Sequence, residues 1–160
     1  MKTDLIETVL NKGCKSLNLS DSSIWGNLRL IQNSRLRKLD ITNCRASPYD
    51  VIEELLASCH ILQNLSLKGL QLTPRMVTSI CKNSQTLQVL KLYYSNLEEE
   101  WHQEIIKTCK EMKQLIFVIS KEQETKLQSK LGLLGYCLKR KTDTWTSVQP
   151  KPGLGIGNQN

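Results

Sequence analysis

A short leucine pattern recurs along the chain at nearly constant spacing. Each copy has a leucine three positions after its start and another hydrophobic residue two positions later. Four clear copies are spaced by 26, 25 and 25 residues, an earlier copy precedes them by 22, and a weak match follows them. The copies start at Cys14, Leu36, Leu62, Leu87, Met112 and Leu131. Such a pattern, with a period of roughly 20–29 residues, is typical of leucine-rich repeats.

The stretch after each leucine pattern has the features of a helix. Ser47 and Thr73 are each followed by proline, and a Ser or Thr cap before proline is a common helix start. Apolar residues then recur at intervals of three and four, which places them on one helical face. They are Val51, Ile52, Leu55 and Leu56, then Val77, Ile80 and Cys81, then Trp101, Ile105, Ile106 and Cys109. Each unit is therefore expected to be a strand, a turn and a helix.

The predicted fold class is α/β, in the form of a leucine-rich-repeat solenoid with about five or six repeats. One unit cannot bury both of its faces, so units stack, with a parallel β ladder on the concave face and helices on the convex face. We expect a capping helix in residues 1–13, repeats in residues 14–138 and an irregular basic tail in residues 139–160. The capping helix is predicted from the apolar Leu5, Ile6, Val9 and Leu10 and from Asp4 and Glu7 as a capping box.

Composition and charge narrow the class of protein. The 160 residues suit one domain with one core. No apolar run approaches the roughly 20 residues of a membrane helix, and charges at the N-terminus stand where a signal peptide is apolar. We therefore expect a nuclear or cytoplasmic protein that is not secreted. The net charge is +7, of which residues 121–160 supply +4. A basic tail attracts nucleic acid, an anionic membrane or a phosphoprotein, or forms only a solvated surface.

The six cysteines carry no sign of metal or redox chemistry. No pair has the C-x-x-C spacing of a zinc site, and Cys44, Cys59 and Cys109 hold fixed places in the repeat. This regularity indicates small buried hydrophobic residues rather than catalytic thiols or disulfides. No nucleophile, base and orienting group stand together in the sequence. The sequence thus predicts no catalytic residue, no metal site, no cofactor and no enzymatic activity.

The residues between the strand leucines are the candidate binding surface. Side chains alternate along a strand, so these residues face the concave surface. The predicted partner-binding residues are Asp40, Thr42, Asn64, Ser66, Lys68, Lys91 and Tyr93. Lys68, Lys91 and Tyr93 are expected to lie together because neighbouring strands are about 4.8 Å apart. Such a cluster suits an acidic or phosphorylated peptide, and the competing interpretation is that the lysines only solvate the sheet.

Several segments resemble one family of repeat proteins. They are LQNLSLKGL at 62–70, KNS at 82–84, MKQL at 112–115 and QPKPG at 149–153. With the cysteines, they resemble the cysteine-containing leucine-rich repeats of F-box proteins over roughly residues 36–155. The S-phase kinase-associated branch of that family, which selects substrates for SCF-type cullin–RING ubiquitin ligases, is the most similar. The resemblance implies substrate recognition in protein degradation and the cell cycle, and an irregular tail that covers the apolar Ile116 and Val118.

The start of the chain departs from that family, in which an F-box precedes the repeats. Only 13 residues precede Cys14 here, so we expect a fragment, a short form or a binding protein without ligase function. Ligase subunits are expected as partners only if an F-box lies outside these residues. The favoured function is a noncatalytic, monomeric protein-binding module. The alternatives are a nucleic-acid-binding basic repeat protein, with Tyr93 and Tyr94 as stacking groups, and a free-standing leucine-rich-repeat scaffold.

Overall fold

The computed structural model describes residues 1–28, 34–93, 99–118, 125, 128–129, 132–133, 136–142 and 145–150. It is a mixed α/β structure. Its helices are α1 (Thr3–Asn11), α2 (Asp50–Ala57), α3 (Pro74–Lys82) and α4 (Glu99–Thr108). In spatial order, the main sheet contains β1 (Ser16–Asn18), β3 (Lys38–Asp40), β5 (Asn64–Leu67), β6 (Val89–Tyr93), β7 (Gln114–Val118), β9 (Trp145–Pro150) and β8 (Tyr136–Thr142). Strands β2 (Ser23–Trp25) and β4 (Arg45–Ser47) form a separate parallel pair.

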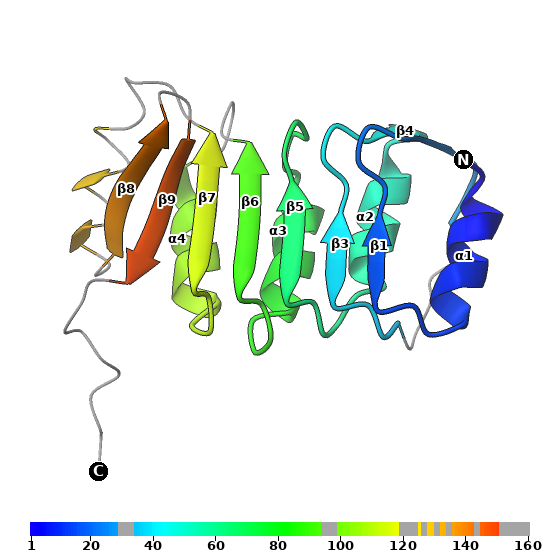
Figure 1. Ribbon diagram of the computed structural model, residues 1–160, viewed down its shortest axis with the longest axis horizontal. Helices are drawn as coiled ribbons and strands as arrows, with labels where there is room; N and C mark the ends of the chain where they lie inside the picture. Colours follow the sequence, from blue (N-terminus) through cyan, green and yellow to red (C-terminus); the bar gives the residue numbers. More distant parts are fainter. Residues whose placement is uncertain are drawn as a thin grey trace, which may run out of the picture.

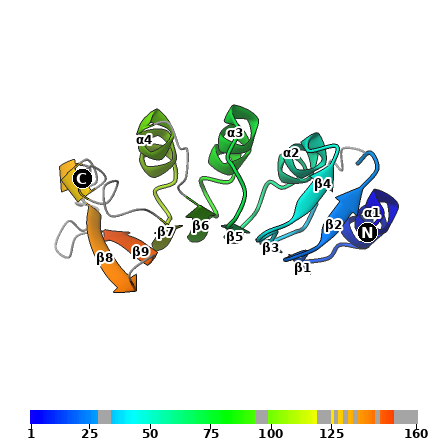
Figure 2. The ribbon, with the colours of Figure 1, turned by 90° about the horizontal axis from the view of Figure 1, so that it is seen from above.

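The strands of the main sheet stand side by side in chain order from β1 to β7 (Figure 1). All neighbouring pairs in this part of the sheet are parallel. Helices α2, α3 and α4 lie together on one side of the sheet, and Figure 2 shows that the strands follow a curve with the helices on its outside. We call the opposite, inner side of the sheet the concave face.

A constant register aligns the leucines of successive strands. Leu17 pairs with Leu39, Leu39 with Leu65, Leu65 with Leu90 and Leu90 with Leu115. The last four of these side chains are buried in the hydrophobic core, together with the apolar residues of the helices. The predicted parallel ladder is therefore confirmed, and we use the word row for residues that occupy the same position in successive strands.

A left-handed residue ends three of the ladder strands. Asp21, Asn43 and Gly69 have φ angles of 56°, 51° and 75°, a region that glycine and, less readily, Asn and Asp adopt. In each case the next residue donates its N–H back across the turn, as from Cys44 to the carbonyl of Ile41 at 3.1 Å. A Cβ on Gly69 would lie 2.0 Å from Oδ1 of Asn43. The turns therefore stack closely enough that glycine is needed at this position.

The helices bury the predicted faces, but two of the three predicted starts are wrong. Thr73 caps α3 by accepting a hydrogen bond from the N–H of Met76, with Pro74 in the first turn, as expected. Ser47 instead belongs to β4, and α2 begins at Asp50. Helix α1 follows Lys2 without a side-chain cap, and Leu5 is exposed. Within the described part of the chain, no helix combines the length and apolar character needed to cross a membrane.

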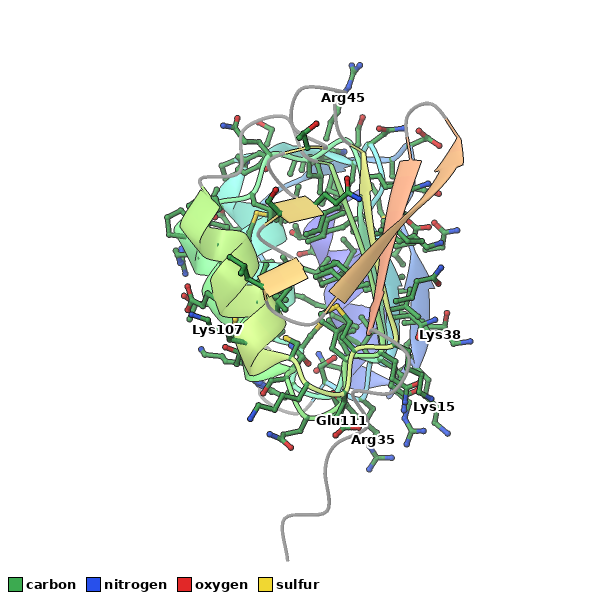
Figure 3. The ribbon with its side chains drawn as sticks, turned by 90° about the vertical axis from the view of Figure 1, so that its left-hand side faces the viewer. Lys15, Arg35, Lys38, Arg45, Lys107 and Glu111 are labelled. Carbon is green, nitrogen blue, oxygen red and sulfur yellow. The ribbon has the colours of Figure 1, made fainter. Side chains whose placement is uncertain are left out.

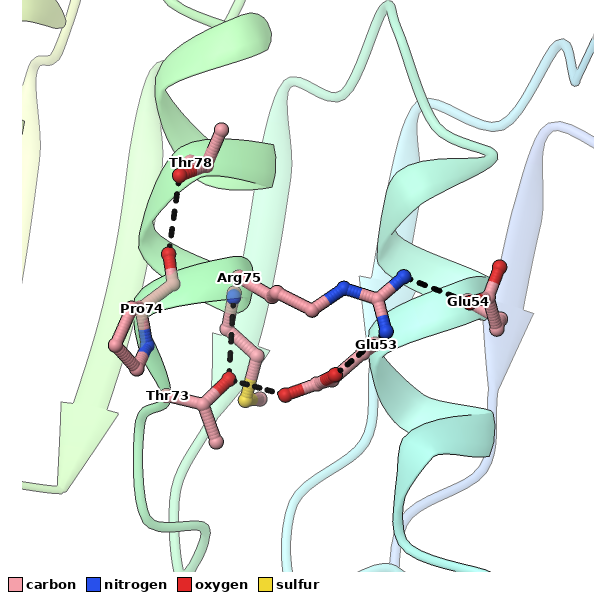
Figure 4. A network of polar contacts seen from close by, with 7 residues as sticks. Glu53, Glu54, Thr73, Pro74, Arg75 and Thr78 are labelled. Carbon is pink, nitrogen blue, oxygen red and sulfur yellow. Dashed lines mark hydrogen bonds and ion pairs between the residues drawn. The ribbon is translucent and has the colours of Figure 1, made fainter.

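The Thr73 cap also joins helices α2 and α3 (Figure 4). Its hydroxyl donates a hydrogen bond to Glu53 of α2, and Arg75 forms ion pairs with Glu53 at 3.1 Å and with Glu54 at 2.8 Å. The Glu53 side chain is only 12% exposed, whereas that of Arg75 is 60% exposed. The half-buried Glu53 carboxylate therefore has one partner on each oxygen, the Thr73 hydroxyl on Oε1 and the more exposed Arg75 guanidinium on Oε2.

The expected irregular tail is largely wrong. Residues 136–142 and 145–150 form strands β8 and β9, although the predicted tail began at 139. Strand β9 pairs antiparallel with β7, Ile116 lies opposite Ser147, and β8 pairs antiparallel with β9. The apolar end of the ladder is thus extended by an antiparallel hairpin, whereas the sequence predicted an irregular tail that covers it. Residues 151–160 lie outside the described residues.

The leucine row gives the first test of the core. Because Leu65 is 2% exposed in the centre of the ladder, Leu65→Ala should lower the free energy of unfolding by roughly 2–5 kcal/mol. Leu5→Ala removes the same atoms from a side chain that is 54% exposed and should cost less than about 0.5 kcal/mol. Urea unfolding followed by circular dichroism measures both, and equal costs would contradict the assigned core.

The junction between α2 and α3 gives a second test. Thr73→Ala removes the cap and leaves Glu53 without its hydroxyl donor, so the free energy of unfolding should fall by about 1–2 kcal/mol. Arg75→Ala removes only the exposed ion pairs and should lower it less, since such pairs are screened by solvent. The comparison uses urea unfolding in low and high salt. A larger loss for Arg75→Ala, strongest in low salt, would show that the ion pairs rather than the cap hold the helices together.

Candidate functional site

The concave face carries a shallow hollow of about 400 Å³. It extends along β1, β3, β5, β6 and β7, and its lining includes the residues that alternate with the leucines of these strands and so face away from the core. Its outward-facing residues are Ser16, Asn18, Lys38, Asp40, Asn64, Ser66, Val89, Lys91 and Gln114. One surface is therefore built from equivalent positions of five successive strands, so a single extended ligand crossing it would meet side chains from each of them.

Two rows of residues line this hollow. The register places Asn18, Asp40, Ser66 and Lys91 in one row. It places Ser16, Lys38, Asn64, Val89 and Gln114 in the other. Because these positions are two residues apart, the strand pleat turns both rows toward the concave face. Four of the seven residues predicted from the sequence, namely Asp40, Asn64, Ser66 and Lys91, line the hollow.

Three of the predicted residues are engaged in hydrogen bonds of the fold. Oδ1 of Asp40 accepts the N–H of Thr42 at 2.9 Å, just as Asn18 accepts that of Ser20. The hydroxyls of Thr42 and Ser66 lie 2.8 Å apart, and Ser66 is 7% exposed. These contacts shape the ends of the strands. Asp40, Thr42 and Ser66 therefore have less capacity for a partner than their sequence positions suggested.

The lining side chains that can donate to an anionic or acceptor group include two lysines and several amides. Lys38 is exposed, and Asn64 and Lys91 are half-buried. Within the described residues, the ion pairs of the molecule join Arg75 to Glu53 and Glu54, so neither Lys38 nor Lys91 pairs with a described carboxylate. Asp40 is the acidic side chain among the lining residues. The hollow consequently favours a ligand with acceptor oxygens or negative charge.

Lys68 and Tyr93 lie farther along the strands than the hollow. Lys91 pairs with Ser66, so Lys68, two residues beyond Ser66, occupies the neighbouring row and does not line the hollow. Tyr93 is the last residue of β6, and its side chain lies outside the described residues. Lys38 was missing from the predicted site. The strand alternation already placed it in the row of Asn64, and its charge was the signal that could have identified it.

The cysteines have the structural character expected of them where they are described. Cys44, Cys59 and Cys109 are buried, and Cys14 and Cys81 are half-buried. The thiol of Cys59 donates a hydrogen bond to the carbonyl of Leu55 at 3.3 Å. Burial raises the pKa of Cys59 from 9.0 to about 12, although Ser34 hydrogen-bonds to it. The pKa of Cys109 is also raised, mainly by a hydrogen bond with Cys81 and secondly by burial. High pKa values make these two thiols poor nucleophiles.

The described residues contain no group of three His, Cys, Asp or Glu side chains that could hold a metal ion. Comparisons with protein-family models, with curated proteins and with solved structures found no match for this chain.

The burial of Cys59 predicts a pH dependence of stability. Its pKa is raised on folding, so the neutral thiol is the form that the folded state favours. The resulting stabilisation is complete below pH 9 and is lost as the pH rises toward about 12, because only the unfolded thiol then ionises. The difference in unfolding free energy between the wild type and Cys59→Ala should therefore shrink over this interval, by up to about 1.4 kcal/mol per pH unit.

Alkylation provides a check of the same thiol that does not depend on other titrating groups. In the folded protein at pH 8, iodoacetamide should leave Cys59 unmodified, whereas the protein unfolded in urea should be labelled there. Peptide mass spectrometry locates the label. Rapid labelling of Cys59 in the folded protein would show that the thiol is accessible and ionised, which its burial excludes.

Proposed function

We propose that the chain is a leucine-rich-repeat solenoid that acts as a noncatalytic protein-binding module. The repeat period and the constant register support the solenoid, since each period of about 25 residues adds one strand to the same ladder. The placement of α2, α3 and α4 on the outer side supports it further. Repeat proteins of this kind bind partners on their concave surface.

The observation that carries this proposal is the hollow on the concave face. It is lined by side chains from five strands, and its two lysines have no described carboxylate partner. Burying such a surface under an extended protein segment lets several strands each contribute a contact, and the lysines attract acceptor or anionic groups of that segment. Acidic and phosphorylated peptides have the matching chemistry.

The resemblance to F-box proteins extends the proposal to a biological role. By that resemblance, the module selects substrates for an SCF-type ubiquitin ligase, in the nucleus or the cytoplasm, and so takes part in protein degradation during the cell cycle. The free-standing scaffold is the alternative. If an F-box lies outside these residues, affinity purification of the protein that carries both separates the two by mass spectrometry, because a ligase component co-purifies with its adaptor and cullin whereas a scaffold recovers only its partners.

Charge reversal on the concave face tests the binding surface. In the double variant Lys68→Glu, Lys91→Glu, partners recovered by affinity purification should be lost, because the two introduced carboxylates repel an anionic segment that the lysines attract. The matched control is Lys107→Glu, Lys110→Glu, which changes the net charge equally on exposed residues at the end of α4 and just after it. The control should keep its partners, and the thermal midpoints of both variants should stay close to the wild type.

Two outcomes of that experiment would contradict the proposal. If the concave variant keeps its partners, the binding surface lies elsewhere. If the purified wild type instead binds nucleic acid with an affinity that falls steeply with salt, the basic repeat protein is the correct interpretation, since phosphate contacts lose roughly 0.7–0.9 log units of affinity per decade of salt for each neutralised phosphate.

A further inference from the structure

Five basic residues gather where the first two strands of the ladder begin. Arg37 and Lys38 both donate their backbone N–H to the carbonyl of Lys15, at 2.8 and 3.0 Å. Arg35 lies beside the turn that leads to Lys15, since a Cβ on Gly13 would be 3.7 Å from its Cδ. We call Lys12, Lys15, Arg35, Arg37 and Lys38 the basic edge. Figure 3 shows Lys15 and Arg35 near the lower edge of the molecule and Lys38 above them on the side of the sheet away from the helices.

The basic edge is exposed and lacks described counter-charges. All five side chains are exposed, and within the described residues the ion pairs of the molecule involve Arg75 alone among the cations. Neighbouring strands bring Lys15 and Arg37 to within about 5 Å at their backbones, so like charges repel across the ladder. The fold places these cations together although no described carboxylate compensates their charge, and an anionic ligand would relieve the repulsion.

The basic edge is narrow, and its width favours one kind of anion. The row that contains Lys15 and Arg37 continues through Gln63 and Gln88, which are neutral, before it reaches Lys113. The cations therefore lie at the starts of two neighbouring strands, one spacing of about 5 Å apart, which is far less than the run of phosphates along a duplex. The basic edge also contains no aromatic side chain on which a base could stack. A short run of carboxylates fits better, and the two arginines can each hold a carboxylate with two hydrogen bonds.

Lys38 connects this edge to the hollow. It belongs to the basic edge and also lines the hollow, where Asn64 and Lys91 follow on the next strands. We propose that the basic edge binds a run of Asp and Glu residues in a partner peptide whose adjoining segment crosses the hollow. This inference rests on the proposed peptide binding of the concave face, and it adds the position and the charge of one end of the ligand.

A displayed library of random peptides tests the proposal on the full chain. Peptides of about 16 residues are suitable, since they span roughly 50 Å when extended. Selected peptides should be enriched in runs of Asp and Glu. Their affinity, measured by fluorescence anisotropy, should fall at least about tenfold in the variant Lys15→Glu, Arg37→Glu, Lys38→Glu. It should also fall, by a smaller factor, in Lys15→Gln, Arg37→Gln, Lys38→Gln, in which the first two substitutions copy the glutamine native to the row of Lys15 and Arg37 at 63 and 88.

The control is Arg45→Glu, Lys107→Glu, Lys110→Glu, which replaces one exposed arginine and two exposed lysines that do not belong to the basic edge. It has the same net charge as the triple glutamate variant of the edge, and it should bind the peptides within about twofold of the wild type. Circular dichroism shows whether each variant is folded. If the glutamate variant of the edge does not fold, the glutamine variant is used for the comparison in its place.

The remaining outcomes separate this inference from the function on which it rests. Selected peptides without acidic enrichment, or equal losses in the edge and control variants, would overturn the inference. If Lys91→Glu still lowers the affinity for those peptides, the proposed binding surface on the concave face is retained. A library that yields no binder would overturn both proposals. Tighter binding of a DNA duplex of about 20 base pairs than of any selected peptide, lost in the edge variant, would assign the edge to nucleic acid instead.

Discussion

The backbone hydrogen bonds between parallel strands determine most of the architecture of this molecule. Parallel strands cannot be joined by a tight turn, so the chain must return over a distance that a helix can fill. Each return after β3, β5 and β6 contains a helix, and all three helices lie on one side of the sheet. The other side is left open. The concave face is thus a consequence of the way in which the strands are connected, and the register decides which side chains stand next to each other on it.

The leucine rows and the α3 start were predictable because each depends on neighbouring residues in the sequence. Ser47 shows where that reasoning fails. It has the same Ser/Thr-Pro signal as Thr73, but it pairs with Trp25 of β2, and this pairing between segments prevails over the local cap preference. The C-terminal hairpin was missed for a similar reason. The glycines and prolines near the end indicated an irregular chain, whereas the position of β9 depends on the open edge of β7.

The candidate binding surface was predictable to the level of rows but not of individual side chains. Alternation along the strands places Asp40, Asn64 and Lys91 correctly on the concave face. It does not reveal that Asp40 already accepts a hydrogen bond from its own turn, because that contact depends on the left-handed residue Asn43 and on the shape of the turn. Lys38 was overlooked since its row ends in neutral and apolar residues. Which members of a row are free is decided by turn geometry that the repeat pattern does not encode.

The antiparallel hairpin has a consequence for self-association. A repeat sheet with an exposed parallel edge offers a template on which a second copy can add its own strands, and head-to-tail addition that does not close produces filaments. Here the edge strand at that end is β8, whose sequence includes Lys139, Arg140 and Lys141. The pairing of β8 with β9 is irregular between Arg140 and Thr142. Positive charge and an interrupted register both disfavour the addition of a further strand, so the hairpin keeps the ladder finite as well as completing it.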